Sequence, residues 1–430
     1  MEFLTTGEKI KNLRKILGIR QEELTSIGVS RNFISMVEND KRKLSLKTAQ
    51  LLIKIFKSKS NEVEIDLDID EKYLLKSPDD EAREYCIKKI NDVLSIEEID
   101  NLIDVSIRYN LLDILSTLYV HKGNIIYSNN GYGEAFTNYY NALDIYNSIN
   151  SLKDKAFIYN KLGKCRLQML EYFESLSFFT KAHKLSLIGN HKLIEKNALY
   201  NMALVYKRLN KIDDALRYIN EYIDMCDYNA DFFDIIDAKT LEANCYFIKG
   251  QYNVSIQSYK EILNKEDKLK YSLVGNVYNN LGLAYLEVND LENSLLYFNK
   301  SQKLRKLNDK SNVHRTLIDK SNVFIRNRLI NEATNLLRKG FDMSVIYNDL
   351  EYILLSFNML ESIYIDLSDN ERVTSLYEEM LQIVSGEKNT KPSLLIYTKI
   401  SNKLALIDIE NNDIEKCKSR LTTLNNQLNM

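Results

Sequence analysis

Residues 159–182, YNKLGKCRLQMLEYFESLSFFTKA, and residues 278–301, YNNLGLAYLEVNDLENSLLYFNKS, share one pattern that decides the fold. Each stretch begins with tyrosine and places leucine and glycine three and four positions later. A serine follows twelve residues after the glycine, and a phenylalanine stands four residues beyond it. Because the two stretches lie far apart in the chain, they indicate an internal repeat.

The glycine position of this pattern recurs at a nearly constant spacing. Equivalent positions fall at 123, 163, 203, 243, 282, 321, 361 and about 405, so the period is about 40 residues. Small residues let paired helices cross closely, while aromatic residues fill the gaps between them. The pattern resembles the tetratricopeptide repeat, lengthened past its usual period of about 34 residues by longer helices. We expect about eight repeats from residue 116.

The composition favours helix along the whole chain. Only 2 Pro and 13 Gly occur in 430 residues, and hydrophobic residues make up 45%. A chain so poor in helix breakers favours an all-α fold. The tetratricopeptide resemblance implies that the repeats stack into a right-handed α-solenoid.

Signatures of export, membrane insertion and catalysis are missing from the sequence. The N-terminus, MEFLTTGEKIKNLRK, has no apolar core of signal-peptide length, and no later run approaches about 18 uncharged apolar residues. We therefore expect a cytoplasmic protein that does not span a membrane. The cysteines and histidines are scattered, and no HExxH, GxSxG or P-loop motif occurs. We predict no enzymatic activity, no cofactor and no metal site.

Charge is distributed unevenly along the chain. Residues 1–59 hold 13 Lys and Arg against 6 Asp and Glu, a balance of +7, whereas the remainder holds 45 against 54, a balance of -9. A basic segment joined to an acidic body indicates that the N-terminal segment binds a polyanion.

The basic segment has the pattern of a helix-turn-helix. An apolar stripe that contains Ile10 and Leu13 ends at Gly18, and residues 21–26 predict a second short helix. Ser30 is placed to cap the next helix, SRNFISMVEND. Two helices joined by a tight glycine turn, with the second able to lie in the major groove, form this DNA-binding motif.

This stretch resembles the phage-repressor (Cro/XRE-type) helix-turn-helix family through GIRQEEL at 18–24, GVS at 28–30 and ISMVEN at 34–39. It departs from the family in three ways. The second helix is one residue short, Thr25 replaces the usual alanine, and Asp40 stands where glycine normally adopts a left-handed turn. The resemblance also implies an internal ion pair between Arg14 and Glu38.

Residue roles in the helix-turn-helix follow from this resemblance. Gln21 is expected to hold a phosphate, and Lys41 and Arg42 to grip the DNA backbone further along. Arg31, Asn32 and Ser35 are the outward-facing polar residues of the recognition helix and our candidates for base contacts. The predicted DNA-binding set is Gln21, Ser30, Arg31, Asn32, Ser35, Lys41 and Arg42.

A change of composition separates the basic segment from the repeats. Residues 60–84 carry ten acidic residues against three basic ones, and they contain Pro78. This predicts a short helix around 71–76 and a break at Ser77-Pro78. The expected domains are therefore 1–59, which binds DNA, a linker over 60–80, and 81–430, which holds the repeats.

In tetratricopeptide superhelices the first helix of each repeat lines the groove, through its fifth and ninth consensus positions. Seven of the sixteen equivalent positions are asparagine, whose carboxamide can pair with an extended peptide backbone. The enrichment has two alternative causes: the repeat consensus favours asparagine at these positions, and the whole chain is rich in it. We expect these side chains to face a solvated groove, with basic neighbours such as Lys207, Arg208 and Arg315 able to hold a carboxylate. The predicted peptide-binding set is Asn124, Asn160, Lys164, Asn244, Asn279, Asn322, Arg326 and Asn358.

A Cro-type helix-turn-helix followed by tetratricopeptide repeats resembles the RRNPP family of Gram-positive quorum-sensing regulators, the PlcR/NprR/Rgg-like group. The resemblance implies a homodimer on a palindromic double-stranded DNA operator, controlled by a short signalling peptide in the groove. One alternative is a protein-binding adaptor, or a Rap-like effector that sequesters a response regulator through residues 60–115. Another is a regulator without a small ligand, whose repeats only dimerise.

Overall fold

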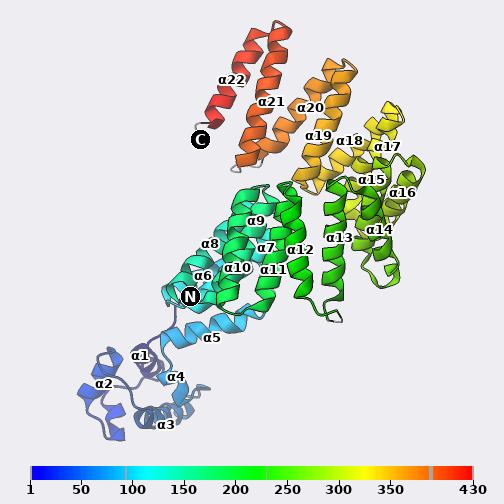
Figure 1. Cartoon of the computed structure of the whole chain (residues 1–430). Helices are drawn as coiled ribbons and strands as arrows, with labels where there is room; N and C mark the ends of the chain where they lie inside the picture. The colour runs from blue at the N-terminus through cyan, green and yellow to red at the C-terminus, as the bar shows by residue number, and fades with distance from the viewer. Residues whose placement is uncertain (1, 93, 229, 387–390, 429–430) are drawn as a thin grey trace. The chain divides into compact units, whose positions relative to one another are not determined.

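The computed structural model describes residues 2–92, 94–228, 230–386 and 391–428. The described residues form helices and connecting turns without any strand, as the composition predicts. The chain divides into two compact units (Figure 1). One comprises Met1–Ile126 with Thr137–Asn150, and the other comprises Tyr127–Phe136 with Ser151–Met430.

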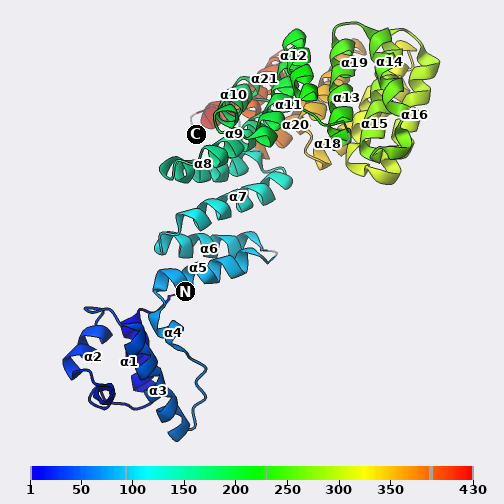
Figure 2. The same ribbon diagram turned by 60° about the horizontal axis from the view of Figure 1, so that its bottom comes forward.

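The first unit begins with a small helical bundle, α1 to α4 (Figure 2). Its core includes Leu24, Ile34, Leu52 and Phe56, each at most 1% exposed. The next helices pack as antiparallel neighbours, and Pro78 is the first residue of α5, where its missing N–H costs nothing. The bounds are α1 Thr6–Ile16, a 3₁₀ helix Glu23–Ile27, α2 Arg31–Glu38, α3 Leu46–Glu62, α4 Glu71–Leu75, α5 Pro78–Ile90, α6 Ile96–Arg108, α7 Leu112–Ser128 and α8 Tyr132–Ser148.

The second unit is a row of antiparallel helix pairs, each packed on the next. Its bounds are α9 Leu152–Gln168, α10 Tyr172–Ile188, α11 Lys192–Arg208, α12 Ile212–Asp224, α13 Phe232–Ile248, α14 Tyr252–Leu263, α15 Tyr271–Glu287, α16 Leu291–Asn308, α17 Val313–Arg326, α18 Ile330–Ile346, α19 Leu350–Asp366, α20 Asn370–Gly386, α21 Lys391–Glu410 and α22 Ile414–Leu428. Across the residues described, no helix combines the length and apolar character needed to cross a membrane.

The helix lengths explain the period of about 40 residues. Helices α9, α10 and α11 each have 17 residues, and three residues separate each from the next. A residue with positive φ ends most helices, and at Asn190 and Asn210 it is asparagine, which tolerates this conformation better than most residues. Eight asparagines of the described chain have this conformation, so part of the asparagine in the sequence has a structural role in the turns between helices.

Each recurring glycine marks a close helix crossing. A Cβ placed on Gly163 would lie 2.6 Å from a ring carbon of Phe179, and one on Gly282 would lie 2.8 Å from Phe298. The serine of the pattern joins the two helices at the same crossing, because the Ser175 hydroxyl on α10 donates a hydrogen bond to the Gly163 carbonyl on α9 at 2.8 Å. The repeat pattern thus encodes both the contact and the hydrogen bond that align two helices.

Candidate functional site

The recognition helix α2 presents a polar face to solvent. Ser30 caps it by accepting a hydrogen bond from the Phe33 N–H at 3.1 Å, while Ile34 and Val37 are buried on the opposite side. Arg31 and Asn32 are exposed, and the guanidinium of Arg31 lies 3.1 Å from the exposed Glu22 carboxylate. An ion pair this exposed is weak, so Arg31 can exchange Glu22 for another acceptor at little cost.

A buried carboxylate fixes the position of the recognition helix. Glu38 accepts hydrogen bonds from Arg14 at 2.7 and 3.2 Å and from the Gln21 carboxamide at 2.8 Å. This confirms the ion pair implied for Arg14 and Glu38. Gln21 is half-buried by the same contact, so its carboxamide orients the motif as well as being a candidate for phosphate binding.

The segment before the recognition helix differs from the expectation. Instead of an α-helix over 21–26, a 3₁₀ helix runs over Glu23–Ile27 and ends at Gly28, whose φ is 81°. With one residue missing, fewer residues must span this segment, and a 3₁₀ helix rises about 2.0 Å per residue where an α-helix rises about 1.5 Å.

Asp40 accounts for one departure from the repressor pattern. Its φ of 54° is the left-handed conformation that glycine usually provides. Its carboxylate also accepts hydrogen bonds from the Thr5 hydroxyl at 2.6 Å and the Gly7 N–H at 3.0 Å, which ties the turn to the start of α1. The exposed Lys41 and Arg42 follow directly, and Arg42 lies over the ring of Phe33 at 5.3 Å.

Two of the predicted groove asparagines are buried, at 7% exposure for Asn160 and 4% for Asn279. The side-chain Oδ1 of Asn160 accepts a hydrogen bond from the Asn201 carboxamide at 2.8 Å, and the Asn279 carboxamide donates one to the Asp319 carboxylate at 2.5 Å. For these two residues the expectation of a side chain facing a solvated groove is wrong, because each one joins neighbouring repeats.

The other predicted residues differ in how far their polar groups are used. Asn124 and Asn244 each accept a hydrogen bond from a tyrosine of the following helix. Asn322 donates to a backbone carbonyl of its own helix, and Arg326 donates to the backbone carbonyl of Leu286 at the end of α15. Lys164 and Asn358 are exposed, and no hydrogen bond or ion pair in the described part of the chain engages their side chains. Lys164 and Asn358 are therefore the members most accessible to a ligand.

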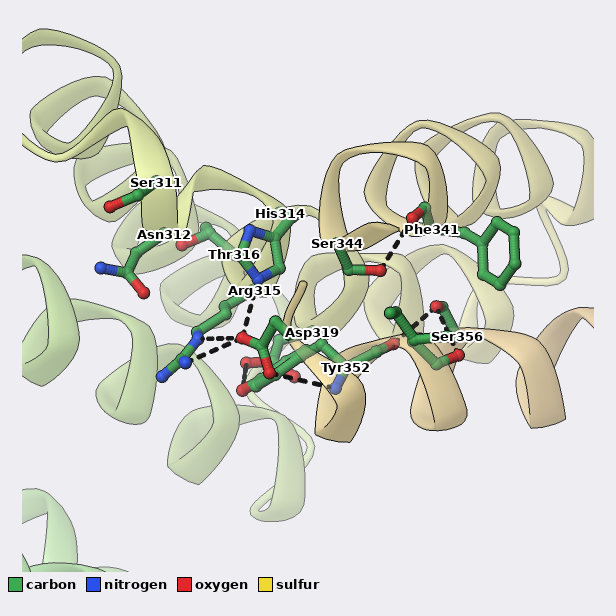
Figure 3. Close-up of polar contacts among 12 residues, drawn as sticks. Ser311, Asn312, His314, Arg315, Thr316, Asp319, Phe341, Ser344, Tyr352 and Ser356 are labelled. Carbon is green, nitrogen blue, oxygen red and sulfur yellow. Dashed lines mark hydrogen bonds and ion pairs between the residues drawn. The ribbon is translucent and has the colours of Figure 1, made fainter. Parts of the chain in front are cut away.

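Sequence reasoning missed a buried polar network between α15, α17 and α19, and Figure 3 labels several of its residues on α17 and α19. Asp319, 4% exposed, accepts from Asn279 and also from the Tyr352 hydroxyl at 3.3 Å. Beside it, His314 and Arg315 both contact the Asp349 carboxylate, at 2.9 and 2.8 Å. The available signal was an aspartate that directly follows the buried stretch Thr316–Ile318, next to a consensus groove position.

Burial controls the protonation of this network. Removal from water raises the pKa of Asp319 to about 6, although Asn279 donates to it and Arg305 lies nearby. The pKa of Asp349 is lowered despite its burial, because His314 and Arg315 stabilise the charged carboxylate. The network thus contains one carboxyl group whose pKa is raised by burial and one whose pKa is lowered by its cationic neighbours.

Comparison with known families identifies both kinds of module. A helix-turn-helix family matches residues 10–63, and tetratricopeptide-repeat families match residues 154–227 and 275–306. No curated protein sequence matches the chain significantly.

Solved structures with the same architecture include the NprR complex with its cognate peptide NprX. That structure is 18% identical, covers 77% of this chain and 93% of its own, and has a TM-score of 0.50. The apo form of the quorum sensor NprR from B. thuringiensis is 18% identical over 80% of this chain and 92% of its own, with a TM-score of 0.48. Aspartyl phosphate phosphatase F from Bacillus subtilis is 14% identical over 79% of this chain and 96% of its own, with a TM-score of 0.47. The chain therefore contains a helix-turn-helix segment followed by tetratricopeptide repeats, in a fold similar to that of NprR.

Proposed function

We propose that this protein is a DNA-binding transcription regulator whose repeats bind a short signalling peptide, and that the peptide changes DNA binding or activation. The observation that carries the proposal is the exposed polar face of α2, with Ser30 at its N-cap and Arg31 and Asn32 able to reach DNA bases. A helix with this arrangement fits the major groove, where arginine reads guanine and asparagine reads adenine.

The phosphate contacts are assigned to residues on either side of the recognition helix. Lys41 and Arg42 are exposed at the turn after α2, while Gln21 precedes it and is held by Glu38. Ser30 and Ser35 complete the proposed DNA-binding set. Because one small motif buries little DNA surface, two copies in a cytoplasmic homodimer would bind a palindromic operator with half-sites about one helical turn apart.

The peptide is assigned to the repeats, and NprR offers the parallel, because its structure is of a complex with a cognate peptide. Lys164 on α9 and Asn358 on α19 are the most accessible members of the proposed set. Asn124, Asn244, Asn322 and Arg326 would have to share or exchange their present hydrogen bonds. Asn160 and Asn279 would act indirectly, by holding the repeats that carry the other residues.

Selection of DNA from a random duplex pool tests the proposed readout. The full-length chain should enrich one palindromic sequence, and Arg31→Ala should lose about 1–3 kcal/mol of preference at one base position of each half-site. Lys41→Ala should weaken binding to all sequences alike and reduce its salt dependence. Lys184→Ala removes the same charge from an exposed site on α10 and serves as the control. Enrichment of no sequence, or unchanged selectivity in Arg31→Ala, would contradict this assignment.

A pool of short random peptides tests the groove by equilibrium dialysis. Asn358→Ala should reduce peptide retention severalfold, because it removes hydrogen bonds to the ligand that contribute about 0.5–1.5 kcal/mol each to binding. It should not lower the melting temperature, because the Asn358 side chain is exposed. Asn160→Ala is the matched contrast, since it removes a buried bond between repeats and should lower the melting temperature. Peptide retention that is unaffected by Asn358→Ala would place the ligand elsewhere.

A further inference from the structure

One ion pair in the second unit joins helices that are distant in the sequence. The Arg208 guanidinium at the end of α11 contacts the Glu351 carboxylate at the start of α19, although 143 residues separate them. Stacked repeats normally contact only their neighbours. Other side-chain bonds between repeats of this unit link residues about 40 apart, such as Arg338 with Glu379. The Arg208–Glu351 pair therefore bridges across several repeats.

The surroundings of this pair carry an additional positive charge. Lys207 is half-buried next to Arg208, and no ion pair in the part of the chain described here engages its ammonium group. Burial, followed by repulsion from Arg208, lowers the pKa of Lys207 to about 8, while Glu351 acts in the opposite direction. A second carboxylate close to both cations would relieve this cost.

The partners of the pair are themselves accessible to solvent. The side chains of Arg208 and Glu351 are 37% and 38% exposed. Nearby, Arg315 is already engaged by Asp349 at 2.8 Å, so its charge is compensated within the unit. Arg208 contacts Glu351 and Lys207 lies within electrostatic range of it, so these two cations share one exposed internal carboxylate.

We propose that Lys207 and Arg208 form a binding site for a ligand carboxylate, and that Glu351 competes with the ligand for it. This inference rests on the proposed peptide-binding function and specifies the chemistry of one group of the ligand, a carboxylate, for which the free C-terminus of a peptide is the probe. An arginine and a lysine can hold a carboxylate through charge-assisted hydrogen bonds, which are stronger than neutral ones. When the ligand carboxylate replaces Glu351 on Arg208, the bridge between α11 and α19 opens, so ligand binding is coupled to the spacing of distant repeats.

The test compares two pools of short random peptides that lack Asp and Glu, one with free C-terminal carboxylates and one with C-terminal amides. Each pool is dialysed against the full-length protein, and the ratio of retained acid to retained amide is measured. Glu351→Gln should raise this ratio about two- to fivefold, because it removes a competing exposed ion pair. Arg208→Gln should lower it about tenfold by removing a charge-assisted contact, and Lys207→Gln should lower it as well. Glu379→Gln breaks the neighbouring-repeat pair with Arg338, 2.6 Å long, and should leave the ratio unchanged.

Each result decides the inference. A ratio of acid to amide that rises in Glu351→Gln and falls in Arg208→Gln supports the inference. Equal retention of the amide pool by wild type and Glu351→Gln shows that the groove is intact. Retention of both pools with a ratio that neither variant changes overturns the carboxylate site and leaves the peptide-binding function standing. Failure of wild type and every variant to retain either pool overturns both.

Discussion

A methyl group added at Gly163 tests how the repeat crossing is built. The Cβ of Gly163→Ala would lie 2.6, 2.7 and 2.9 Å from three ring carbons of Phe179, well inside the usual carbon contact of about 3.5–4.0 Å. Phe179 is fully buried and packs against Met202 and Val205, so its ring has little room to move. Relief of the overlap requires a shift of α9 away from α10. Overpacking of this kind typically lowers the free energy of unfolding by about 1–3 kcal/mol.

The helix propensity of alanine opposes this cost by about 1 kcal/mol, so the net loss of stability should be about 0–2 kcal/mol. Gly133→Ala is the matched control, because Gly133 also lies in a helix and its Cβ would meet nothing within 4 Å. It receives the gain in propensity without the clash. The free energies of unfolding of the two variants should therefore differ by about 1–3 kcal/mol, as measured by circular dichroism in denaturant.

A smaller partner at position 179 should rescue the clash. Phe179→Leu alone leaves a cavity and destabilises the protein, but in the Gly163→Ala background the added methyl group fills part of that cavity. The double variant should be more stable than the sum of the single effects predicts by at least about 1 kcal/mol. Strict additivity, or a Gly163→Ala variant as stable as Gly133→Ala, would refute the link between the repeat pattern and the helix crossing.

Three further substitutions test contacts elsewhere in the molecule. Lys9→Met should lower the free energy of unfolding by about 3 kcal/mol, because the 2.7 Å ion pair with Glu81 is lost from a site where Lys9 is 1% exposed; melting like wild type would contradict this. Burial raises the pKa of Asp319 to about 6 in the folded protein, so protonation of Asp319 stabilises the fold. This stabilisation is complete below about pH 4 and is lost as the pH rises through 6, and Asp319→Asn should remove this pH dependence. Parallel stability profiles of the two proteins between pH 4 and 7 would exclude it. Ser294→Ala should cost about 1 kcal/mol in thermal melts, since its hydroxyl donates to the Gly282 carbonyl at 2.7 Å; no change would show that this bond is dispensable.

The sequence was sufficient to predict the fold because local pattern and packing agree. Gly163 and Gly282 stand sixteen residues before the phenylalanines that they contact, so the periodicity directly reports helix crossings. The ion pair between Arg14 and Glu38 was predictable for a similar reason, since the repressor motif fixes the spacing of both residues. The 3₁₀ helix at Glu23–Ile27 was not, because one missing residue changes the type of helix without changing its amphipathic pattern.

The candidate groove was less predictable than the fold. The position of an asparagine in a repeat identifies the helix face but does not reveal whether a neighbour already uses its carboxamide, as Asn201 does for Asn160. The same limit hid the Asp319 network, because Asp319 and its two partners lie on three different helices. Contacts such as Arg208 with Glu351 depend on the curvature of the whole row of helices, and no local motif encodes that curvature.

The central claim, that a peptide in the repeats controls DNA binding, is tested most directly by measuring one affinity twice. A fluorescent duplex carrying the sequence enriched by the full-length chain is titrated with the protein, in the absence and in the presence of a saturating peptide recovered from the random pool. Peptide and DNA should be coupled by about 1–3 kcal/mol, which changes the DNA dissociation constant at least about fivefold in one direction. The same dissociation constant with and without bound peptide would contradict the claim that the repeats regulate the helix-turn-helix through its affinity for DNA.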